Sequence, residues 1–250
     1  MPGRRSKGFD VGRSLARLAD LSVNYTIPEG VEPGPATGWH RDTQRTVVGQ
    51  EPVGEPGEGG AWALACQVVR DYEFAEPRIL HAIYRGAAPV VGRDMLLEGR
   101  FFGLRFYMGV RVTEVIDERR DGLEGPTRVW GWAYETLDGH LEKGHLSYEV
   151  VKHLDTGVVE FVIDGYSQRA PIPNPVIRWG FRVFGRNTQV RFYRGCAERI
   201  QRLVKEALDG HPLPIPQAFT DDDSLLLAPS DATTSPVAAL APRSHDPGTE

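Results

Sequence analysis

The sequence predicts one α+β domain in which a curved antiparallel sheet of about six strands is covered by a long C-terminal helix. Two observations predict this fold class. Between residues 61 and 169 apolar residues recur mostly at every second position, which is the spacing of strands that bury one face. After Pro175 the spacing becomes that of an amphipathic helix, and this is the long element available to cover the sheet.

Composition divides the chain into three parts. Residues 1–60 are predicted to be a basic N-terminal arm and an irregular Pro- and Gly-rich lead-in, with a short strand over Arg45–Gly49 at most. Residues 61–210 are the predicted α+β domain. Residues 211–250 contain six acidic residues, one arginine and seven prolines. We expect a disordered acidic tail there that is dispensable for stability.

The elements of the central part follow from their period and their turns. Alternation predicts a strand over 61–74, and Pro77 suits the first turn of a short helix over 75–84. Turns rich in Gly and Asp then separate five further strands, over 94–99, 104–118, 127–136, 145–154 and 158–168. The long helix begins at Pro175 and ends before Gly210, with Gly185 and Asn187 indicating a kink or a break.

Charge and cysteine content narrow the class of protein. The net charge of −5 belongs to the tail, so the body is neutral and lacks the basic excess of a nucleic-acid binder. No stretch has the roughly 18 apolar residues of a transmembrane segment, and the N-terminus is no secretory signal. Cys66 and Cys196 suit reduced core thiols in a cytoplasmic protein. The oligomeric state is not indicated.

Part of the chain resembles a known family. The features that carry the resemblance are Tyr134-Glu135-Thr136-Leu137, Gly139-His140, Glu142, Gly144 and Asp164-Gly165-Tyr166-Ser167. With them, residues from Arg93 to about Leu203 resemble the family catalogued as domain of unknown function nineteen-ninety. Asp138 and Leu141 stand where proline is common in that family.

The order of strands and helix is also similar to the helix-grip superfamily (START-like, SRPBCC-type). In that superfamily a curved sheet wraps a long helix around a cavity, and its members include lipid carriers, hormone receptors and polyketide cyclases. The resemblance implies a helix-grip fold with a cavity between sheet and helix. Fold alone fixes no chemistry.

Aromatic side chains are the candidate ligand-binding residues. The strand over 127–136 places Trp130, Trp132, Tyr134 and Thr136 on one face. Tyr148 on the next strand, and Phe181 and Phe184 on the helix, complete the predicted lining. Apolar walls with a few polar groups are typical of small-molecule pockets. The alternative is that these rings pack against the helix as ordinary core.

His140 and Glu142 follow a predicted hairpin turn at the rim of the sheet. With Tyr134 they are the candidate catalytic residues, because a paired histidine and carboxylate can transfer protons on a bound ligand. The alternative is a solvated turn. Adding His145 gives H-x-E-x-x-H, but no further ligand cluster supports a metal site, and the sequence indicates no cofactor.

Three functions remain open from the sequence. The first is binding of a hydrophobic or aromatic small molecule between sheet and helix. The second is a cyclase- or isomerase-type enzyme on the same scaffold, so whether the chain is an enzyme is undecided. The third is an interaction protein whose tail docks on a partner through Leu225–Pro229.

Overall fold

The computed structural model describes residues 10–101, 104–170, 175–219, 222–232 and 243–245. Within these ranges the side chains of residues 100–101, 104–105, 175–188, 222–223 and 243–245 lie outside the description. The helices are α1 (Val11–Arg17), α2 (Ala61–Arg70) and α3 (Pro175–Leu208), with short 3₁₀ turns at Leu18–Asp20 and Pro35–Thr37. The strands are β1 (His40–Gln50), β2 (Leu80–Arg85), β3 (Asp94–Phe101), β4 (Leu104–Gly122), β5 (Gly125–Thr136), β6 (Glu142–His153), β7 (Val158–Arg169), β8 (Gln217–Phe219), β9 (Asp222–Ala228) and β10 (Arg243–His245).

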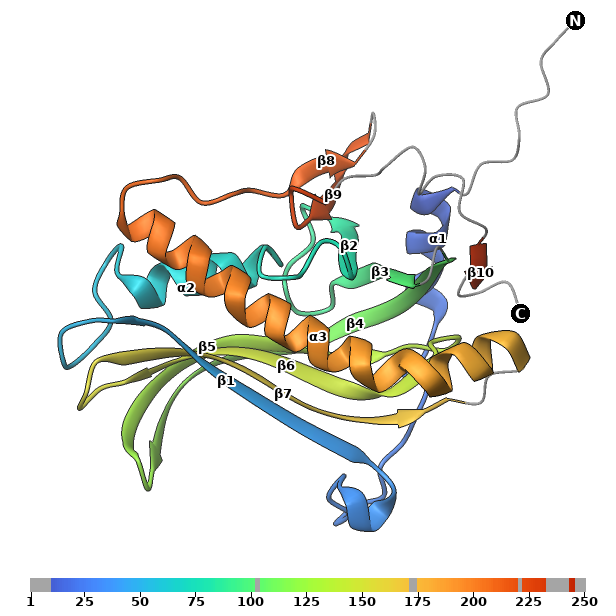
Figure 1. The fold of residues 1–250 in the computed structure, drawn as a ribbon, viewed down its shortest axis with the longest axis horizontal. Helices are drawn as coiled ribbons and strands as arrows, with labels where there is room; N and C mark the ends of the chain where they lie inside the picture. The colour runs from blue at the N-terminus through green and yellow to red at the C-terminus, as the bar shows by residue number, and fades with distance from the viewer. Residues whose placement is uncertain (1–9, 102–103, 171–174, 220–221, 233–242, 246–250) are drawn as a thin grey trace, which may run out of the picture.

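In the part of the chain that the structure describes, these ten strands form one sheet. Nine follow the order β1-β7-β6-β5-β4-β3-β2-β9-β8 with antiparallel neighbours, and β10 pairs in parallel with β4. The sheet curves beneath α3, which crosses its concave face, while α2 lies beside the second half of α3 (Figure 1). The predicted fold class, an antiparallel sheet covered by a long C-terminal helix, is confirmed. The sheet has more strands than the six expected.

Residues 61–70 form α2, so the strand predicted over 61–74 is wrong. The buried residues share a helical spacing, and they are Ala61, Ala65, Cys66, Val68 and Val69. The remote carboxylate of Glu51 begins the helix, because its Oε1 accepts a 2.7 Å hydrogen bond from the backbone N–H of Trp62. Tyr72, with φ of 60°, follows the end of the helix in a conformation that glycine usually occupies. A contact from outside the segment therefore begins α2, and a local backbone conformation ends it.

Two further predicted elements differ from the structure. The segment expected as a short helix over 75–84 contributes β2, whose Ala82 and Tyr84 are buried between β3 and β9. The lead-in that was expected to be irregular contains β1, which is 11 residues long and pairs with β7 along its whole length. In addition α3 runs through Gly185 and Asn187 as one helix of 34 residues.

The expected tail also contains regular structure. β9 pairs with β2, and Leu225, Leu227 and Ala228 are buried against the domain. The proposed docking motif Leu225–Pro229 is thus part of the sheet, and its leucines are unavailable to a partner. The prediction of a disordered tail is wrong for residues 217–219 and 222–228; residues 233–242 and 246–250 lie outside the described residues.

The core lies between the concave face of the sheet and the two helices. Its aromatic centre is a group of rings in mutual contact, with centroids 4.5–6.4 Å apart: Tyr72, Phe74, Trp132, Tyr134, Tyr148 and Phe161. From α3 the buried residues are Phe192, Tyr193, Cys196, Ala197, Ile200, Leu203 and Val204. From Cys196 onward the buried face of α3 rests on side chains of the core. A second apolar cluster lies on the opposite face of β2–β4, beneath Leu15 and Leu18.

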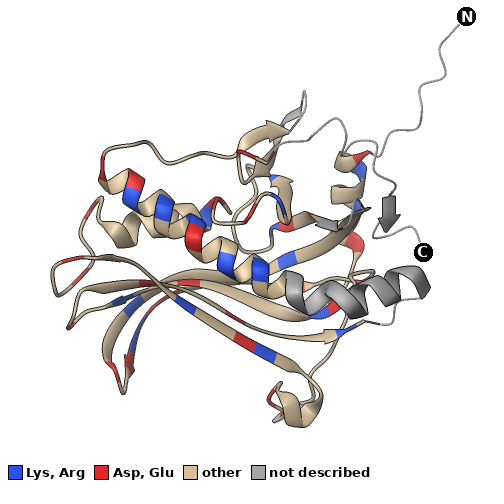
Figure 2. Cartoon of the chain, viewed as in Figure 1, with Lys and Arg blue, Asp and Glu red and all other residues tan. Residues whose placement is uncertain are grey.

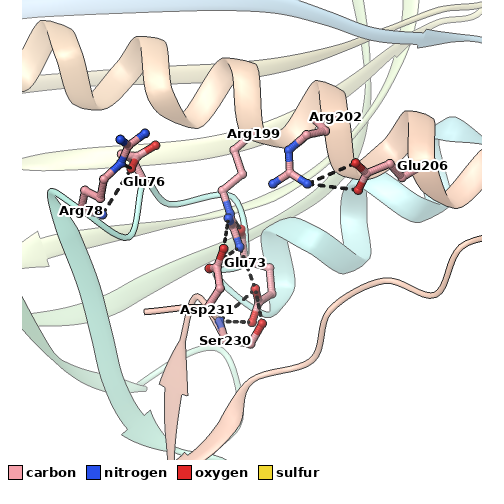
Figure 3. Close-up of polar contacts among 8 residues, drawn as sticks. All are labelled: Glu73, Glu76, Arg78, Arg199, Arg202, Glu206, Ser230 and Asp231. Atoms are coloured by element: carbon pink, nitrogen blue, oxygen red, sulfur yellow. Dashed lines mark hydrogen bonds and ion pairs between the residues drawn. The ribbon is translucent and has the colours of Figure 1, made fainter. Parts of the chain in front are cut away.

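A buried polar cluster joins α3 to the C-terminal segment (Figure 3). The Arg199 guanidinium donates to both Asp231 carboxylate oxygens at 2.8 Å, and its Nε donates to the Glu73 carbonyl oxygen at 2.5 Å. The Glu73 carboxylate accepts hydrogen bonds from the backbone N–H and the hydroxyl of Ser230. Burial raises the pKa of Glu73, which its hydrogen bonds and Arg199 oppose only partly.

A second buried ion pair fixes the start of α2. The Lys152 ammonium group donates to Glu51 Oε2 at 2.7 Å and to the Glu55 carbonyl oxygen at 3.0 Å. Burial alone would raise the pKa of Glu51. Hydrogen bonds from Lys152 and from the backbone of Trp62 outweigh that effect and lower it.

We expect a chain that ends after Gln217 to be markedly less stable than the full chain. The truncation removes the buried Leu225 and Leu227, each worth about 1.5–3 kcal/mol, and takes Ser230 away from Glu73. Urea denaturation of both chains measures the difference. Leu225→Ala in the full chain isolates the apolar contribution, and an unchanged unfolding midpoint in both variants would show that β9 contributes nothing to stability.

The two buried carboxyl groups should have opposite pH dependences. The lowered pKa of Glu51 means that its stabilising effect is present above the ordinary carboxyl range and is lost as pH falls through the folded-state pKa. The raised pKa of Glu73 means that its contribution declines as pH rises from the ordinary value through the folded-state pKa. Urea titrations of Glu51→Gln and Glu73→Gln between pH 3 and 8 test this. The quantity compared is the free energy of unfolding of each variant minus that of the native chain. This difference should become more favourable toward low pH for Glu51→Gln and toward high pH for Glu73→Gln. If it changes with pH in the same direction for both variants, the assignment is contradicted.

Candidate functional site

An opening lies at one end of the concave face, between the strand ends of β1, β5, β6 and β7 and the middle of α3. It encloses about 50 Å³ of free space and is open to solvent on one side. The residues around it are Asp42, Tyr134, Thr136, His140, Glu142, Lys143, Gly144, His145, Leu146, Gly165, Tyr166, Ser167, Gln189 and Tyr193. Pockets for whole drug-sized ligands usually measure about 300–1,000 Å³. The enclosed space therefore suits one small group at the end of a ligand.

Strand register explains which side chains face this opening. Tyr134 pairs with Leu146, and Leu146 pairs with Gly165, so the three residues share the concave face. Glu142 has the same parity as Leu146 on β6. Tyr193 and Gln189, one helical turn apart on α3, form the opposite wall.

Two phenols, Tyr134 and Tyr193, define the chemistry of the inner end. Burial is the main cause that raises the pKa of each phenol well above its ordinary value, so both stay protonated. The ring of Tyr148 packs against Tyr134 from the core side, with centroids 6.0 Å apart. Gln189 Nε2 donates to the Tyr193 hydroxyl oxygen at 3.0 Å. The acceptor side of Tyr193 is therefore engaged by the protein, and each protonated phenol has an O–H that can act as a donor.

His140 and Glu142 lie at the rim, on the turn that leads into β6. The backbone N–H of Glu142 donates to His140 Nδ1 at 2.9 Å, which fixes the imidazole ring against the turn. The same Nδ1 atom lies 2.9 Å from the Glu142 carbonyl oxygen, so the backbone of Glu142 holds the ring in either tautomer. The Glu142 carboxylate is one of the charges that act on both Tyr134 and Tyr193. The three predicted catalytic residues thus line one opening.

Asn24 holds the ends of β5 and β6 together behind the site. Its side-chain oxygen accepts from the Thr136 hydroxyl at 2.7 Å, and its Nδ2 donates to the Glu142 carbonyl oxygen at 3.0 Å. The Thr136 hydroxyl oxygen also accepts from the Gly144 N–H at 2.9 Å. The lead-in segment therefore positions the strand ends that carry the site.

An aromatic group on the opposite, convex face backs the same strand ends. Tyr25, Trp39 and Tyr166 contact one another edge to face with centroids 5.3–6.2 Å apart. The Tyr25 hydroxyl donates to Glu135 Oε1 at 2.8 Å. The His145 ring stacks on Tyr166 at 5.3 Å, and burial lowers the pKa of His145. This group fixes the convex side of the sheet behind the opening.

The other predicted ligand-binding residues lie elsewhere. Trp132 and Tyr148 are fully buried in the aromatic core, and Trp132 Nε1 donates to the Val69 carbonyl oxygen at 3.0 Å. Trp130 is half-buried beneath the guanidinium of Arg70. These three occupy core positions, as in the packing alternative. The side chains of Phe181 and Phe184 lie outside the described residues.

The metal alternative lacks geometric support. Glu142 and His145 have opposite parity on β6, so their side chains leave the sheet on different faces. Among the described residues no group of three or more His, Cys, Asp or Glu is arranged to hold a metal ion.

Ten lining residues were not among the predicted catalytic or ligand-binding residues. They are Asp42, Lys143, Gly144, His145, Leu146, Gly165, Tyr166, Ser167, Gln189 and Tyr193. Asp42 belongs to a segment expected to be irregular, so its place beside β7 could not be foreseen. Tyr193 lies four residues from Gln189, a helical spacing that the sequence does display. Ser167 belongs to the Asp164–Ser167 stretch that carries the family resemblance.

Glycines allow the sheet to bend tightly beside the site. A Cβ atom on Gly165 would lie 2.5 Å from Leu146 Cδ1 and 2.6 Å from the His145 carbonyl oxygen. The second contact is with backbone on the neighbouring strand, which cannot move aside without disturbing the sheet. Glycine is thus required at position 165, because β6 approaches the backbone of β7 too closely there for a side chain.

The fold and the site define a helix-grip protein with an opening at one end of the grip. The chain belongs to the family described as Domain of unknown function (DUF1990), whose profile matches residues 23–199. The comparison with curated proteins gave no match.

Three solved structures of low sequence identity have a similar chain path. Norcoclaurine synthase of Thalictrum flavum is 10% identical with a TM-score of 0.41, covering 68% of this chain and 95% of that one. The ZhuI aromatase/cyclase of Streptomyces sp. R1128 is 14% identical with a TM-score of 0.39, over 68% and 98%. Hypothetical protein jhp0584 of Helicobacter pylori is 14% identical with a TM-score of 0.42, over 72% and 96%. TM-scores below 0.5 say nothing about what this chain binds.

Surface charge and helix composition add two facts. Figure 2 shows Lys and Arg interspersed with Asp and Glu along the coloured, C-terminal part of α3 and over the strands. Among the described helices, none combines the length and the apolar character that crossing a membrane requires.

Gly165→Ala should destabilise the domain and distort the opening, whereas Gly122→Ala should leave both unchanged. A Cβ on Gly122, also a strand residue, meets nothing within 4 Å. Overpacking of this kind typically costs about 1–3 kcal/mol. Urea denaturation measures the loss, and near-ultraviolet circular dichroism of the surrounding tyrosines reports the distortion. Equal stability of the two variants would show that the sheet adjusts freely at Gly165.

Proposed function

We propose that this protein binds a hydrophobic or aromatic small molecule, one end of which enters the opening between the sheet and α3. The observation that carries the proposal is the convergence of Tyr134, Leu146 and Tyr193 from three elements around one solvent-accessible space. An apolar wall with a few placed polar groups is the usual composition of a small-molecule site.

The small size of the enclosed space determines how such a ligand is held. About 50 Å³ takes one polar group or part of a ring. The described core beyond Tyr134 is closed by Tyr148 and Trp132, so the ligand cannot pass deeper. Its remaining part would extend toward the solvent side of the opening.

The buried thiols Cys66 and Cys196 fit the reduced state expected of a cytoplasmic protein.

A second candidate function is acid/base catalysis of the cyclase or isomerase type. The observation in its favour is that His140, Glu142 and Tyr134 line the same opening. A raised phenol pKa makes Tyr134 a hydrogen-bond donor and not a base. Proton removal would then belong to Glu142 or His140, and Tyr134 would stabilise an oxygen on which negative charge develops.

Binding is tested by incubating the full chain with a cellular metabolite extract and identifying retained molecules by native mass spectrometry. We expect a retained aromatic or hydrophobic molecule, and we expect Ser167→Trp, which fills the opening, to abolish its retention. Val47→Trp is the matched control, because Val47 is 52% exposed on the opposite face of β1. Equal retention by both variants would place the ligand elsewhere, and retention of nothing by the native chain would contradict the binding function.

The catalytic candidate makes a separate prediction for any ligand so identified. Chemical conversion of that ligand by the native chain should fall at least about tenfold in Glu142→Gln or His140→Ala, because general acid–base groups typically contribute 10²–10⁴-fold to a rate. Binding should change far less than turnover. No conversion by the native chain leaves binding as the function. Conversion that persists in both variants contradicts the acid/base roles of Glu142 and His140.

A further inference from the structure

We infer that Tyr134 and Tyr193 form a pair of hydrogen-bond donors that recognises a carbonyl oxygen on the ligand. This inference rests on the proposed binding function and names the chemical class of the ligand: an aromatic or apolar body that bears a ketone, quinone or similar carbonyl group. Tyr134 comes from β5 and Tyr193 from α3, so the two phenols approach the opening from opposite walls.

The hydrogen-bonding pattern around Tyr193 determines the direction of its proton. The Tyr193 oxygen already accepts from Gln189 Nε2 at 3.0 Å. A phenol has one O–H donor, and with the acceptor side engaged the remaining role of Tyr193 is to donate. Gln189 lines the same opening, which places this donor beside the enclosed space.

Tyr134 reaches the opening from the sheet side. Its ring packs against that of Tyr148 with centroids 6.0 Å apart, and its single O–H can donate to a group in the opening. Both residues are only 8% exposed, and burial keeps both phenols neutral. Two neutral donors complement an oxygen that carries no proton of its own. An ammonium group or an alkyl group has no lone pair to offer them.

The size of the opening fits the same class of ligand. About 50 Å³ holds a carbonyl oxygen with the carbon atoms next to it, and Leu146 provides an apolar contact beside it. The flat body of the ligand would remain toward the open side.

The test uses the fluorescent ketone 6-propionyl-2-(dimethylamino)naphthalene, whose emission shifts to longer wavelength when its carbonyl accepts a hydrogen bond. The comparison probe is the same naphthalene with a propyl group in place of the propionyl group. Dissociation constants of both probes are measured for the native chain, Tyr134→Phe, Tyr193→Phe and the control Tyr84→Phe. Tyr84 is a buried tyrosine on β2 whose hydroxyl donates to the Asp71 carbonyl oxygen, away from the opening.

We expect each of Tyr134→Phe and Tyr193→Phe to weaken ketone binding roughly three- to tenfold, the net value of one hydrogen bond, and to shift the bound emission to shorter wavelength. Binding of the propyl probe should not change, and Tyr84→Phe should affect neither probe. Ketone binding that is insensitive to both phenols, or equal losses for the two probes, overturns this inference alone. Failure of the native chain to bind either probe contradicts the proposed binding function, and this inference with it.

Discussion

The guanidinium of Arg199 connects three segments that are far apart in the chain, and the placement of α3 depends on it. Arg199 lies on α3, Glu73 follows α2, and Asp231 follows β9 (Figure 3). Glu73 is fully buried, and removing a carboxylate from water is costly unless donors surround it. Ser230 and Arg199 supply those donors only when the three segments meet in one arrangement. Such a buried ion pair is weak evidence of net stability, but it selects one relative position of the segments.

This attachment divides α3 into two halves with different roles. Its C-terminal half is packed, since Ile200, Leu203 and Val204 are buried against the sheet and α2. About two and three turns before Ile200, Tyr193 and Gln189 reach the opening instead. A fold in which one end of the sheet–helix interface is packed and the other end is open can be stable and still admit a ligand. The stability is supplied by the aromatic core beneath the packed half.

How much of this the sequence predicts depends on whether a signal is local. The strands over 104–169 and the long helix were predictable, because apolar period and turn residues lie within each segment. Residues 61–70 were mispredicted as a strand because the apolar residues of AWALACQVV fit both a period of two and a helical period. The contact that begins the helix, from the carboxylate of Glu51, comes from outside the segment. The strand at Leu225–Ala228 was missed because the acidic and proline-rich surroundings suggested disorder, while its partner β2 is more than 130 residues away.

The candidate site shows the same limit. His140, Glu142, Tyr134 and Thr136 were foreseen because one hairpin carries them all, and the structure places them around one opening. Tyr193, Gln189 and Asp42 come from α3 and β1, and no pattern within the hairpin reveals which helical turn or which edge strand faces it. Conversely, Trp132 and Tyr134 are two residues apart on the same face of β5, so the sequence treats them alike.

The different surroundings of Trp132 and Tyr134 follow from their positions along β5. Trp132 lies beneath α2, where the Val69 carbonyl oxygen accepts its N–H and Tyr72 and Tyr148 enclose the ring. Tyr134 lies two residues further toward the strand end, where it lines the opening. A buried ring with a satisfied donor contributes packing alone, whereas a phenol at the boundary keeps a donor that water or a ligand must satisfy. The step from Trp132 to Tyr134 along β5 is therefore the boundary between the packed core and the opening.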